Sequence, residues 1–515
     1  MLLILGLLGL IYPLYLILPI QKIITKNVTP LLIRLASLFL VLELLNIGLN
    51  LSYIQDEVLF LDGIHRLNTN ILIYQLLLIS FSFLLFQVYT YYLKSSETFM
   101  IIFTNVIAIL NLIESYDWLL TIVNYELINI TLYLIVSIKN GSEKAISASI
   151  KYFLLSALTT TFFLLFITLI YALTGTLHWD NMGLLWIFIE KDLKLPLFFM
   201  LITIFFKIGA APFHNWSPDL LDAIPTVLTS WMATIPKFGI LLFLSLFSYF
   251  WVPTPDLESG GIPINYFILF IANISILVGS IGLSSQWRIK RFLAYSAISN
   301  IGFLLLALVC APLELYVSYL IIYALTSIGI FMILVHIGPT LDQQSGFCTL
   351  SIGEAQVEPR SHPGTLNHEL IAYRVYDQEM ILQLSGIYHQ NAFLGLSLTF
   401  LLFSLMGLPP MAGFFAKLMV LASTINLGYI SLALFAILGS IISSVNYLNL
   451  IKIINVNLPM QRLGEATLPI ALGRDPLGYF NALSVSKEIS YYLSIIVAFT
   501  VFFLFYPLNL FTFGS

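Results

Sequence analysis

Apolar segments of about 20 residues recur along almost the whole chain, and a helix of that length spans the hydrocarbon core of a lipid bilayer. Of the 515 residues, 59% are hydrophobic and 9% are charged, whereas soluble domains carry about 25% charged residues. These features exclude an ordinary soluble domain. We predict an all-α polytopic membrane protein.

The apolar segments, bounded by polar or turn residues, predict about fourteen transmembrane helices. They lie near residues 1–20, 30–52, 69–93, 97–114, 117–138, 149–174, 195–212, 224–251, 264–285, 290–311, 314–338, 391–421, 428–453 and 489–510. Long polar connections at 339–390 and 456–488 interrupt the array. The first has no periodic apolar face, so we expect an irregular loop there.

Basic residues accumulate in loops on the side of the membrane that is not translocated, and they therefore test this topology. Of the 22 lysines and arginines, Arg66, Lys191 and Lys194 lie in predicted loops after even-numbered spans, and most others follow odd-numbered spans. We predict an even number of spans, with both termini on the outer side. The first 20 residues contain no basic leader, cleavage site or Arg/Ser-rich presequence, so we expect no removable targeting segment.

Three lysines lie inside predicted spans: Lys207, Lys237 and Lys417. A lysine at the bilayer centre costs about 2.5 to 3.5 kcal/mol, so each position calls for a reason. Lys207 and Lys417 are near span ends, where a lysine can instead extend its ammonium group to the membrane surface. Lys237 lies about midway along its span and reaches the surface less easily.

Two acidic residues lie at similar depth in other spans. Glu126, near the middle of the fifth span, is a candidate partner for a buried lysine. Glu43, in the second span, is a candidate accessory residue, and a structural hydrogen bond with Asn46 is its alternative role. The two cysteines, Cys310 and Cys348, have no disulfide or metal-binding spacing, and we expect neither a disulfide nor a metal cluster.

The seventh and twelfth spans contain residues that break helices, which we interpret as hinges. These residues are Gly209 and Pro212 in the seventh span, and Gly407, Pro409, Pro410 and Gly413 in the twelfth. A broken helix at membrane depth exposes backbone carbonyl groups, which is tolerated where protein or a water-filled cavity satisfies them. Broken spans therefore indicate an ion pathway.

The positions of the two breaks predict an internal symmetry. If spans four to eight and nine to thirteen form two units, each unit has five helices and its fourth helix is broken. An odd number of helices inverts the second unit relative to the first, as in secondary transporters. We predict four regions: three N-terminal spans (1–95), a first five-helix repeat (96–260), a second repeat with the polar loop 339–390 (261–455), and a polar loop with the final span (456–515).

Five stretches of the chain resemble one known family. These stretches are SYDWLLTIVNYELINITLYLI, KYFLLSAL, LPLFFMLITIFFKIGAAPFHNWSPDLLDAIPTVLTSWMATIPKFGIL, WRIKRFLAYSAISNIGFLL and GLPPMAGFFAKLMVL, between about residues 110 and 450. They are similar to the antiporter-like membrane subunits of NADH:ubiquinone oxidoreductase, respiratory complex I. Within that family the chain most resembles subunit 2, because subunit 4 has glutamate at the position of Lys417 and subunit 5 continues into a long lateral helix.

The resemblance implies proton-translocation roles for matching residues. Glu126 matches the acidic residue of the fifth span, Lys207 its partner, Lys237 the central lysine, and Lys417 the lysine of the second half-channel. A proton would pass along these lysines in that order. His214 follows the first break and, with Glu43 and His336, is a candidate accessory residue. Asn300 stands where relatives often have histidine, a departure from the family pattern.

The resemblance also implies the setting of the chain. It would be a multi-pass, organelle-encoded subunit of the mitochondrial inner membrane with its basic loops in the matrix. Its partners would be subunit 4, the small subunits 4L and 6, accessory subunits and phospholipids such as cardiolipin, with no nucleic acid. The chain shows no nucleotide, haem or iron–sulfur motif, so FMN, iron–sulfur clusters and ubiquinone would belong to other subunits.

Two other function classes fit the same sequence. The first is a sodium/proton antiporter subunit, which would show sodium-dependent activity without NADH. The second is a scaffold with a purely structural charged axis, in which neutral substitutions would impair assembly and leave pumping per electron intact.

Overall fold

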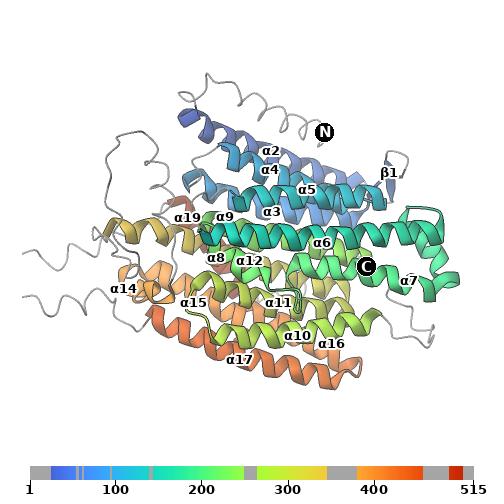
Figure 1. Ribbon diagram of the computed structural model, residues 1–515. Coiled ribbons are helices and arrows are strands. Elements are labelled where there is room, and N and C mark those ends of the chain that lie inside the picture. The colour runs from blue at the N-terminus through green and yellow to red at the C-terminus, as the bar shows by residue number, and fades with distance from the viewer. Residues whose placement is uncertain are drawn as a thin grey trace, which may run out of the picture.

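The computed structural model describes residues 25–53, 57–60, 63–92, 96–137, 143–248, 264–344, 380–455 and 487–502, which form a bundle of helices with a short β-hairpin (Figure 1). The elements are α2 (Thr25–Tyr53), β1 (Val58–Phe60), β2 (His65–Leu67), α3 (Thr69–Tyr92), α4 (Ser96–Glu114), α5 (Trp118–Ser137), α6 (Glu143–Thr174), α7 (Trp179–Ile208), α8 (Trp216–Ala223), α9 (Thr226–Ser248), α10 (Ile264–Ser284), α11 (Ile289–Cys310), α12 (Leu313–Gln344), the 3₁₀ helix η2 (Ile381–Leu384), α14 (Ile387–Gln390), α15 (Ala392–Met406), α16 (Ala412–Asn426), α17 (Ile430–Asn455) and α19 (Lys487–Phe502).

Helices cover every predicted span that falls within the described residues, and the first span, 1–20, lies outside them. Among the described helices, 8 contain a stretch long and apolar enough to cross a membrane. These stretches are Thr69–Gln87, Trp118–Ser137, Lys144–Thr174, Thr226–Ser248, Ile264–Ser284, Ile289–Cys310, Leu313–Ile337 and Ile430–Asn455. Shorter apolar stretches are Ala36–Leu51, Thr98–Glu114, Leu195–Ile208, Ala392–Met406, Ala412–Asn426 and Ile489–Phe502.

Helix α9 lies inside the bundle. Its apolar stretch is 100% buried within the protein, whereas that of α17 is 28% buried. In Figure 1, α2 to α5 occupy one edge of the bundle and α10 and α17 the opposite edge, and α9 contacts α3, α4, α7, α11 and α12. A helix that is apolar on all sides suits such a position. Lys237, which α9 carries, is therefore held far from the lipid.

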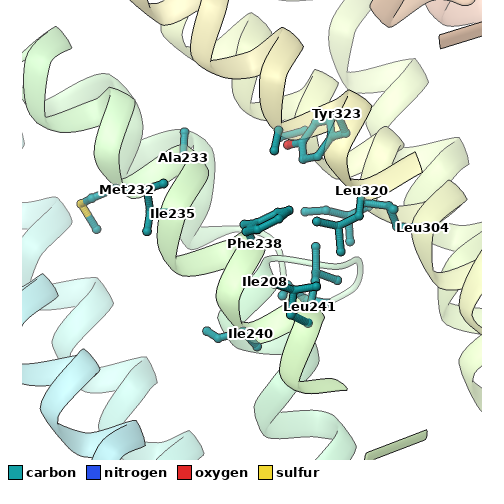
Figure 2. Close-up of a cluster of buried hydrophobic side chains, with 14 of the residues drawn as sticks. Ile208, Met232, Ala233, Ile235, Phe238, Ile240, Leu241, Leu304, Leu320 and Tyr323 are labelled. Carbon is teal, nitrogen blue, oxygen red and sulfur yellow. The ribbon is translucent and has the colours of Figure 1, made fainter. Parts of the chain in front are cut away.

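The packing around α9 is made of large apolar side chains. Figure 2 shows Phe238 and Leu241 of α9 directed toward Leu304 of α11 and toward Leu320 and Tyr323 of α12, and all five are buried. In a lipid environment the gain from such contacts is van der Waals packing, because lipid tails are themselves apolar. This packing fixes α9 relative to the helices of the C-terminal half.

Helix α7 begins earlier than predicted. The sequence predicted a span at 195–212 after a loop, but α7 starts at Trp179, so Lys191 and Lys194 lie in a helix and the loop assignment was wrong. Gly183 and Pro196 both lie inside α7 without ending it, and the residues between them contain no other glycine or proline. The polar residues after the first break, which were not assigned to any element, form the short helix α8, whose Pro218 lies in the first turn where proline is tolerated.

The connection at 339–390 is not an irregular loop at its ends. Helix α12 extends to Gln344, and residues 381–390 form η2 and α14, while residues 345–379 lie outside the described part. The second connection, 456–488, also lies outside it except for the start of α19. The hairpin of β1 and β2 was not predicted, because strands of 3 residues are too short to show an alternating pattern.

Candidate functional site

The predicted break in the seventh span is present at Gly209. This residue has φ of 79°, a left-handed conformation that favours glycine, and its N–H donates to the carbonyls of Phe205 and Phe206 at 3.0 Å each. The Trp216 indole nitrogen donates to the Phe206 carbonyl at 2.9 Å. Two carbonyl groups in the last turn of α7, those of Phe205 and Phe206, are thus hydrogen-bonded within the protein.

The predicted break in the twelfth span has the same local geometry. Gly407 has φ of 83°, and its N–H donates to the carbonyls of Phe403 at 3.0 Å and Ser404 at 3.1 Å. The Ala211–Pro212 and Pro409–Pro410 peptide bonds are both cis. The two breaks are confirmed, whereas the hinge function of their glycines and prolines stays a prediction.

Lys207 is 3% exposed and lies in the last turn of α7. Its ammonium group donates a hydrogen bond to Asn129 Oδ1 of α5 and another to the Tyr152 hydroxyl of α6 at 3.0 Å. The ammonium nitrogen also lies 5.5 Å from the ring centres of Tyr125 and Tyr152. The ammonium group of Lys207 therefore does not extend to the membrane surface.

Glu126 lies on α5, three residues before Asn129, and the two therefore share one face of the helix. It is half-buried, and the structure describes both Glu126 and Lys207 without an ion pair between them. The hydrogen bonds of the Lys207 ammonium group go to Asn129 and Tyr152, and the role of Glu126 as its partner stays a prediction. Asn129 could have been found from the sequence as a polar residue one turn from Glu126 in an apolar span.

Lys237 is 3% exposed on α9. Its ammonium group donates to Ser217 Oγ of α8 at 3.3 Å and lies 5.9 Å from the ring centre of Trp216. Trp216 also packs against Tyr152, with ring centres 4.8 Å apart. Trp216 therefore packs against Tyr152, which is hydrogen-bonded to Lys207, and also lies near the ammonium group of Lys237. Neither Ser217 nor Trp216 was predicted as a site residue from the sequence.

Lys417 is 8% exposed on α16, beyond the second break. Its ammonium group donates to the carbonyl oxygens of Leu405 at 2.6 Å and Met406 at 3.2 Å. These are the last carbonyls of α15, so the cation satisfies a helix C-terminus and interacts favourably with its dipole. The ring centre of Phe303 lies 5.3 Å from the same nitrogen. Lys417 does not reach the surface either.

The accessory candidates lie in different parts of the bundle. Glu43 is buried on α2, but Asn46 is exposed, and the structure shows no hydrogen bond between these two described residues. His214 is half-buried after the first break, with its ring centre 6.3 Å from that of Tyr295. His336 is buried on α12. No hydrogen bond among the described residues brings these three side chains to the lysines.

Asn300, at the position that departs from the family pattern, belongs to a polar group on α11. Its amide nitrogen donates to the Ser296 carbonyl at 3.0 Å, and its amide oxygen accepts from the Tyr319 hydroxyl at 3.4 Å. The Ser296 hydroxyl is hydrogen-bonded to the Tyr447 hydroxyl. Hydroxyl and amide groups therefore provide the polar contacts at this point of the bundle.

A comparison with known protein families matches a region of the chain that includes Lys207, Lys237 and Lys417. A family model described as "NADH:quinone oxidoreductase/Mrp antiporter, TM" matches residues 115–347 and 366–443, which is more than half of the chain. Glu126, Lys207, Lys237 and Lys417 lie within these ranges.

Curated relatives are similar to the chain over most of its length. NADH-ubiquinone oxidoreductase chain 2 of Rhizopus oryzae is 36% identical over 356 residues, which cover 68% of this chain and 62% of that protein. The chain thus spans less than two thirds of the Rhizopus protein. NADH-ubiquinone oxidoreductase chain 2 of Hyaloraphidium curvatum is 31% identical over 413 residues, covering 79% of this chain and 83% of that protein.

Solved structures share the fold. A chain of respiratory complex I from Thermus thermophilus with bound aureothin is 21% identical with a TM-score of 0.69, covering 98% of this chain and 96% of that one. A chain of the Mrp complex from Dietzia sp. DQ12-45-1b is 15% identical with a TM-score of 0.73, covering 98% and 94%. At these identities the likeness shows the fold alone.

Proposed function

Because the chain belongs to the NADH:quinone oxidoreductase/Mrp antiporter transmembrane family, we propose that it is a proton-translocating subunit of the membrane arm of respiratory complex I. The observation that carries this proposal is the burial of Lys207, Lys237 and Lys417 inside an apolar bundle. Ionisable groups in such surroundings are costly and typically mark proton or ion pathways. The chain 2 names of its curated relatives support membership in NADH:ubiquinone oxidoreductase.

The proposal includes fourteen membrane spans and two inverted repeats, here α4 to α9 and α10 to α17, with the four regions predicted from the sequence. The matched ends of α7 and α15 support it, because Gly209 and Gly407 both adopt positive φ and both donate to carbonyls three and four residues earlier. Each of these helices is the fourth long helix of its repeat when its continuation, α8 or α16, is counted with it. A half-helix end at membrane depth is a typical ion site of such repeats.

In the proposed mechanism, a proton moves from Lys207 to Lys237 and then to Lys417. A carboxylate that approaches a buried ammonium group stabilises its protonated form. Movement of Glu126 toward Lys207 would therefore favour proton uptake, and movement away would favour release. Trp216, between Tyr152 and Lys237, lies where a proton would pass from the first lysine to the second. Transfer there requires water or hydroxyl groups, since an indole ring does not relay protons by itself.

The setting is part of the proposal. We place the chain in the mitochondrial inner membrane with its basic loops in the matrix, encoded in the organelle, beside subunit 4, subunits 4L and 6, accessory subunits and phospholipids. The NADH:ubiquinone reductase reaction would occur elsewhere in the complex, on subunits that hold FMN, iron–sulfur clusters and ubiquinone. This chain would contribute proton movement and no redox centre.

The test is Lys237→Met in the assembled complex, with NADH oxidation and proton translocation measured in the same membrane vesicles. We expect fewer protons translocated per NADH at a normal amount of complex. Lys452→Met is the matched control, because Lys452 is an exposed lysine near the end of α17 and should change neither quantity. An unchanged ratio in Lys237→Met would refute the proposal. Reduced assembly with an unchanged number of protons per NADH would favour a scaffold role. Sodium-dependent activity without NADH would favour an antiporter.

A further inference from the structure

A group of ion pairs joins α8 to the start of α11. Asp222 Oδ2 lies 2.5 Å from the Arg288 guanidinium and 3.2 Å from Arg291 Nε, and the Asp222 side chain is 7% exposed. Asp219 Oδ1 lies 3.1 Å from the Arg291 guanidinium. We call Asp219, Asp222, Arg288 and Arg291 the α8–α11 ion-pair cluster. From the sequence alone, Arg288 and Arg291 are basic residues at the start of the predicted span 290–311.

The spacing of the charges explains how the cluster forms. Asp219 and Asp222 are three residues apart and share one face of α8, and Arg288 and Arg291 have the same spacing at the start of α11. Two acidic positions therefore meet two basic positions along two helix segments. Lys290, between the arginines, is 3% exposed and donates to the Ile224 carbonyl at 2.7 Å, at the C-terminal end of α8. Side chains of α11 thus hold both the face and the end of α8.

The opposite side of α8 contacts the central lysine. Ser217 lies two residues before Asp219, which places it about 200° around the helix from that aspartate. Its hydroxyl oxygen accepts the hydrogen bond from Lys237 at 3.3 Å. Because α8 has only 8 residues, a shift of its charged face moves Ser217 as well.

A pocket of about 270 Å³ lies beside the cluster, and its lining includes Lys144 and Lys151 of α6 together with all four residues of the cluster. Lys151 lies 3.4 Å from Asp219, but its side chain is 63% exposed. An exposed pair of this kind contributes little, whereas removal of one partner from a buried pair leaves an uncompensated charge. Asp222, the least exposed residue of the cluster, is therefore the member that fixes α8.

We propose that Asp222 is a positioning residue for proton transfer: by holding α8 against Arg288 and Arg291, it keeps Ser217 within hydrogen-bond distance of Lys237. The inference rests on the proposed function of Lys237 and deepens it. In the proposed repeats, α8 belongs to the first unit and α11 to the second. The arginines at the start of α11, in the second unit, thus fix the hydrogen bond between Ser217 and Lys237, which both belong to the first unit.

The test measures the NADH-driven proton pumping rate of the assembled complex for Asp222→Asn, Ser217→Ala and the double variant, each at matched amounts of complex. Misplacement of a reacting group by about 1 Å can cost about 100-fold in rate, so we expect a clear fall for each single variant. The double variant should pump no more slowly than the slower single variant, because both changes remove one interaction. Lys151→Gln, which breaks the exposed pair to the same helix, should pump normally.

A density map of the assembled Asp222→Asn complex supplies a second readout, which does not depend on the amount of complex. The distance from Ser217 Oγ to Lys237 Nζ, 3.3 Å in the present structure, should lengthen beyond hydrogen-bond range. If Asp222→Asn does not assemble, the variant with both Arg288→Lys and Arg291→Lys decides, since it keeps both charges and loses both guanidinium hydrogen bonds to Asp222. A fall in its pumping rate would support the inference and an unchanged rate would overturn it.

The outcomes separate this inference from the proposed function. If Lys237→Met lowers pumping while assembled Asp222→Asn pumps normally, or if the effects of Asp222→Asn and Ser217→Ala simply add, the positioning role is wrong and the function stands. If Lys237→Met leaves pumping per NADH unchanged, the proposed function fails and the inference fails with it.

Discussion

Gly413→Ala should impair the second broken helix through a single added methyl group. Gly413 lies in the first turn of α16, and its N–H donates to Ser404 Oγ of α15 at 3.3 Å. A Cβ atom at this position would overlap the Ser404 carbonyl oxygen and lie 2.8 Å from the carbonyl carbon. Ordinary carbon–carbon contacts are about 3.5 to 4.0 Å, so the two helices must separate by about 1 Å. The obstacle is backbone, and no side-chain rotation relieves it.

The same displacement acts directly on Lys417. The residue after Ser404 is Leu405, whose carbonyl accepts from Lys417 at 2.6 Å, and Met406 accepts at 3.2 Å. A shift of about 1 Å moves these contacts out of normal hydrogen-bond range. Overpacking costs about 1 to 3 kcal/mol, and loss of one hydrogen bond to a charged group costs about 1.5 to 3 kcal/mol. We expect a total destabilisation of about 2.5 to 6 kcal/mol and a strongly reduced pumping rate.

The assay compares the thermal stability and the NADH-driven proton pumping rate of the purified complex with and without Gly413→Ala. Gly48→Ala is the matched control, because a Cβ atom at Gly48 on α2 has nothing within 4 Å. It should change neither quantity. A Gly413→Ala complex with normal melting temperature and normal pumping would refute the reasoning that the close approach of α15 and α16 holds Lys417 in place.

Two further substitutions test other parts of the bundle. Asn129→Leu removes one of the two hydrogen-bond acceptors of Lys207 and leaves Tyr152. We expect the free energy of unfolding to fall by about 1.5 to 3 kcal/mol and proton pumping to be slower. Normal pumping at a normal amount of complex would contradict this role of Asn129. Phe238→Ala removes a buried ring of α9 and should destabilise the protein by about 3 to 5 kcal/mol, seen as less assembled complex on native gels (Figure 2). Phe270→Ala, at a ring that is 62% exposed, is its control, and equal losses in both would show that burial is not the cause.

Several properties followed from the sequence because they depend on local chemistry. An apolar segment of about 20 residues satisfies its own backbone hydrogen bonds as a helix, wherever its neighbours lie. The breaks at Gly209 and Gly407 were also predictable, because glycine adopts positive φ at little steric cost and a proline follows closely in both segments. Proline alone is a weaker signal here, since Pro196 and Pro236 lie inside α7 and α9. The burial of Lys237 followed from its position midway along an apolar span.

The partners of the charged groups depended on the tertiary structure alone. Lys207 contacts Asn129, 78 positions away in the chain, and Lys237 contacts Ser217 of a short helix that the sequence analysis did not predict. Lys290, counted with the loops, is buried because α8 packs against the start of α11. The sequence determined which segments are apolar enough to cross a membrane, since the free energy of transfer into lipid is a sum over the residues of a segment. Which polar atom meets each ammonium group is decided only when the helices pack, because such a contact requires two distant segments within about 3 Å of each other.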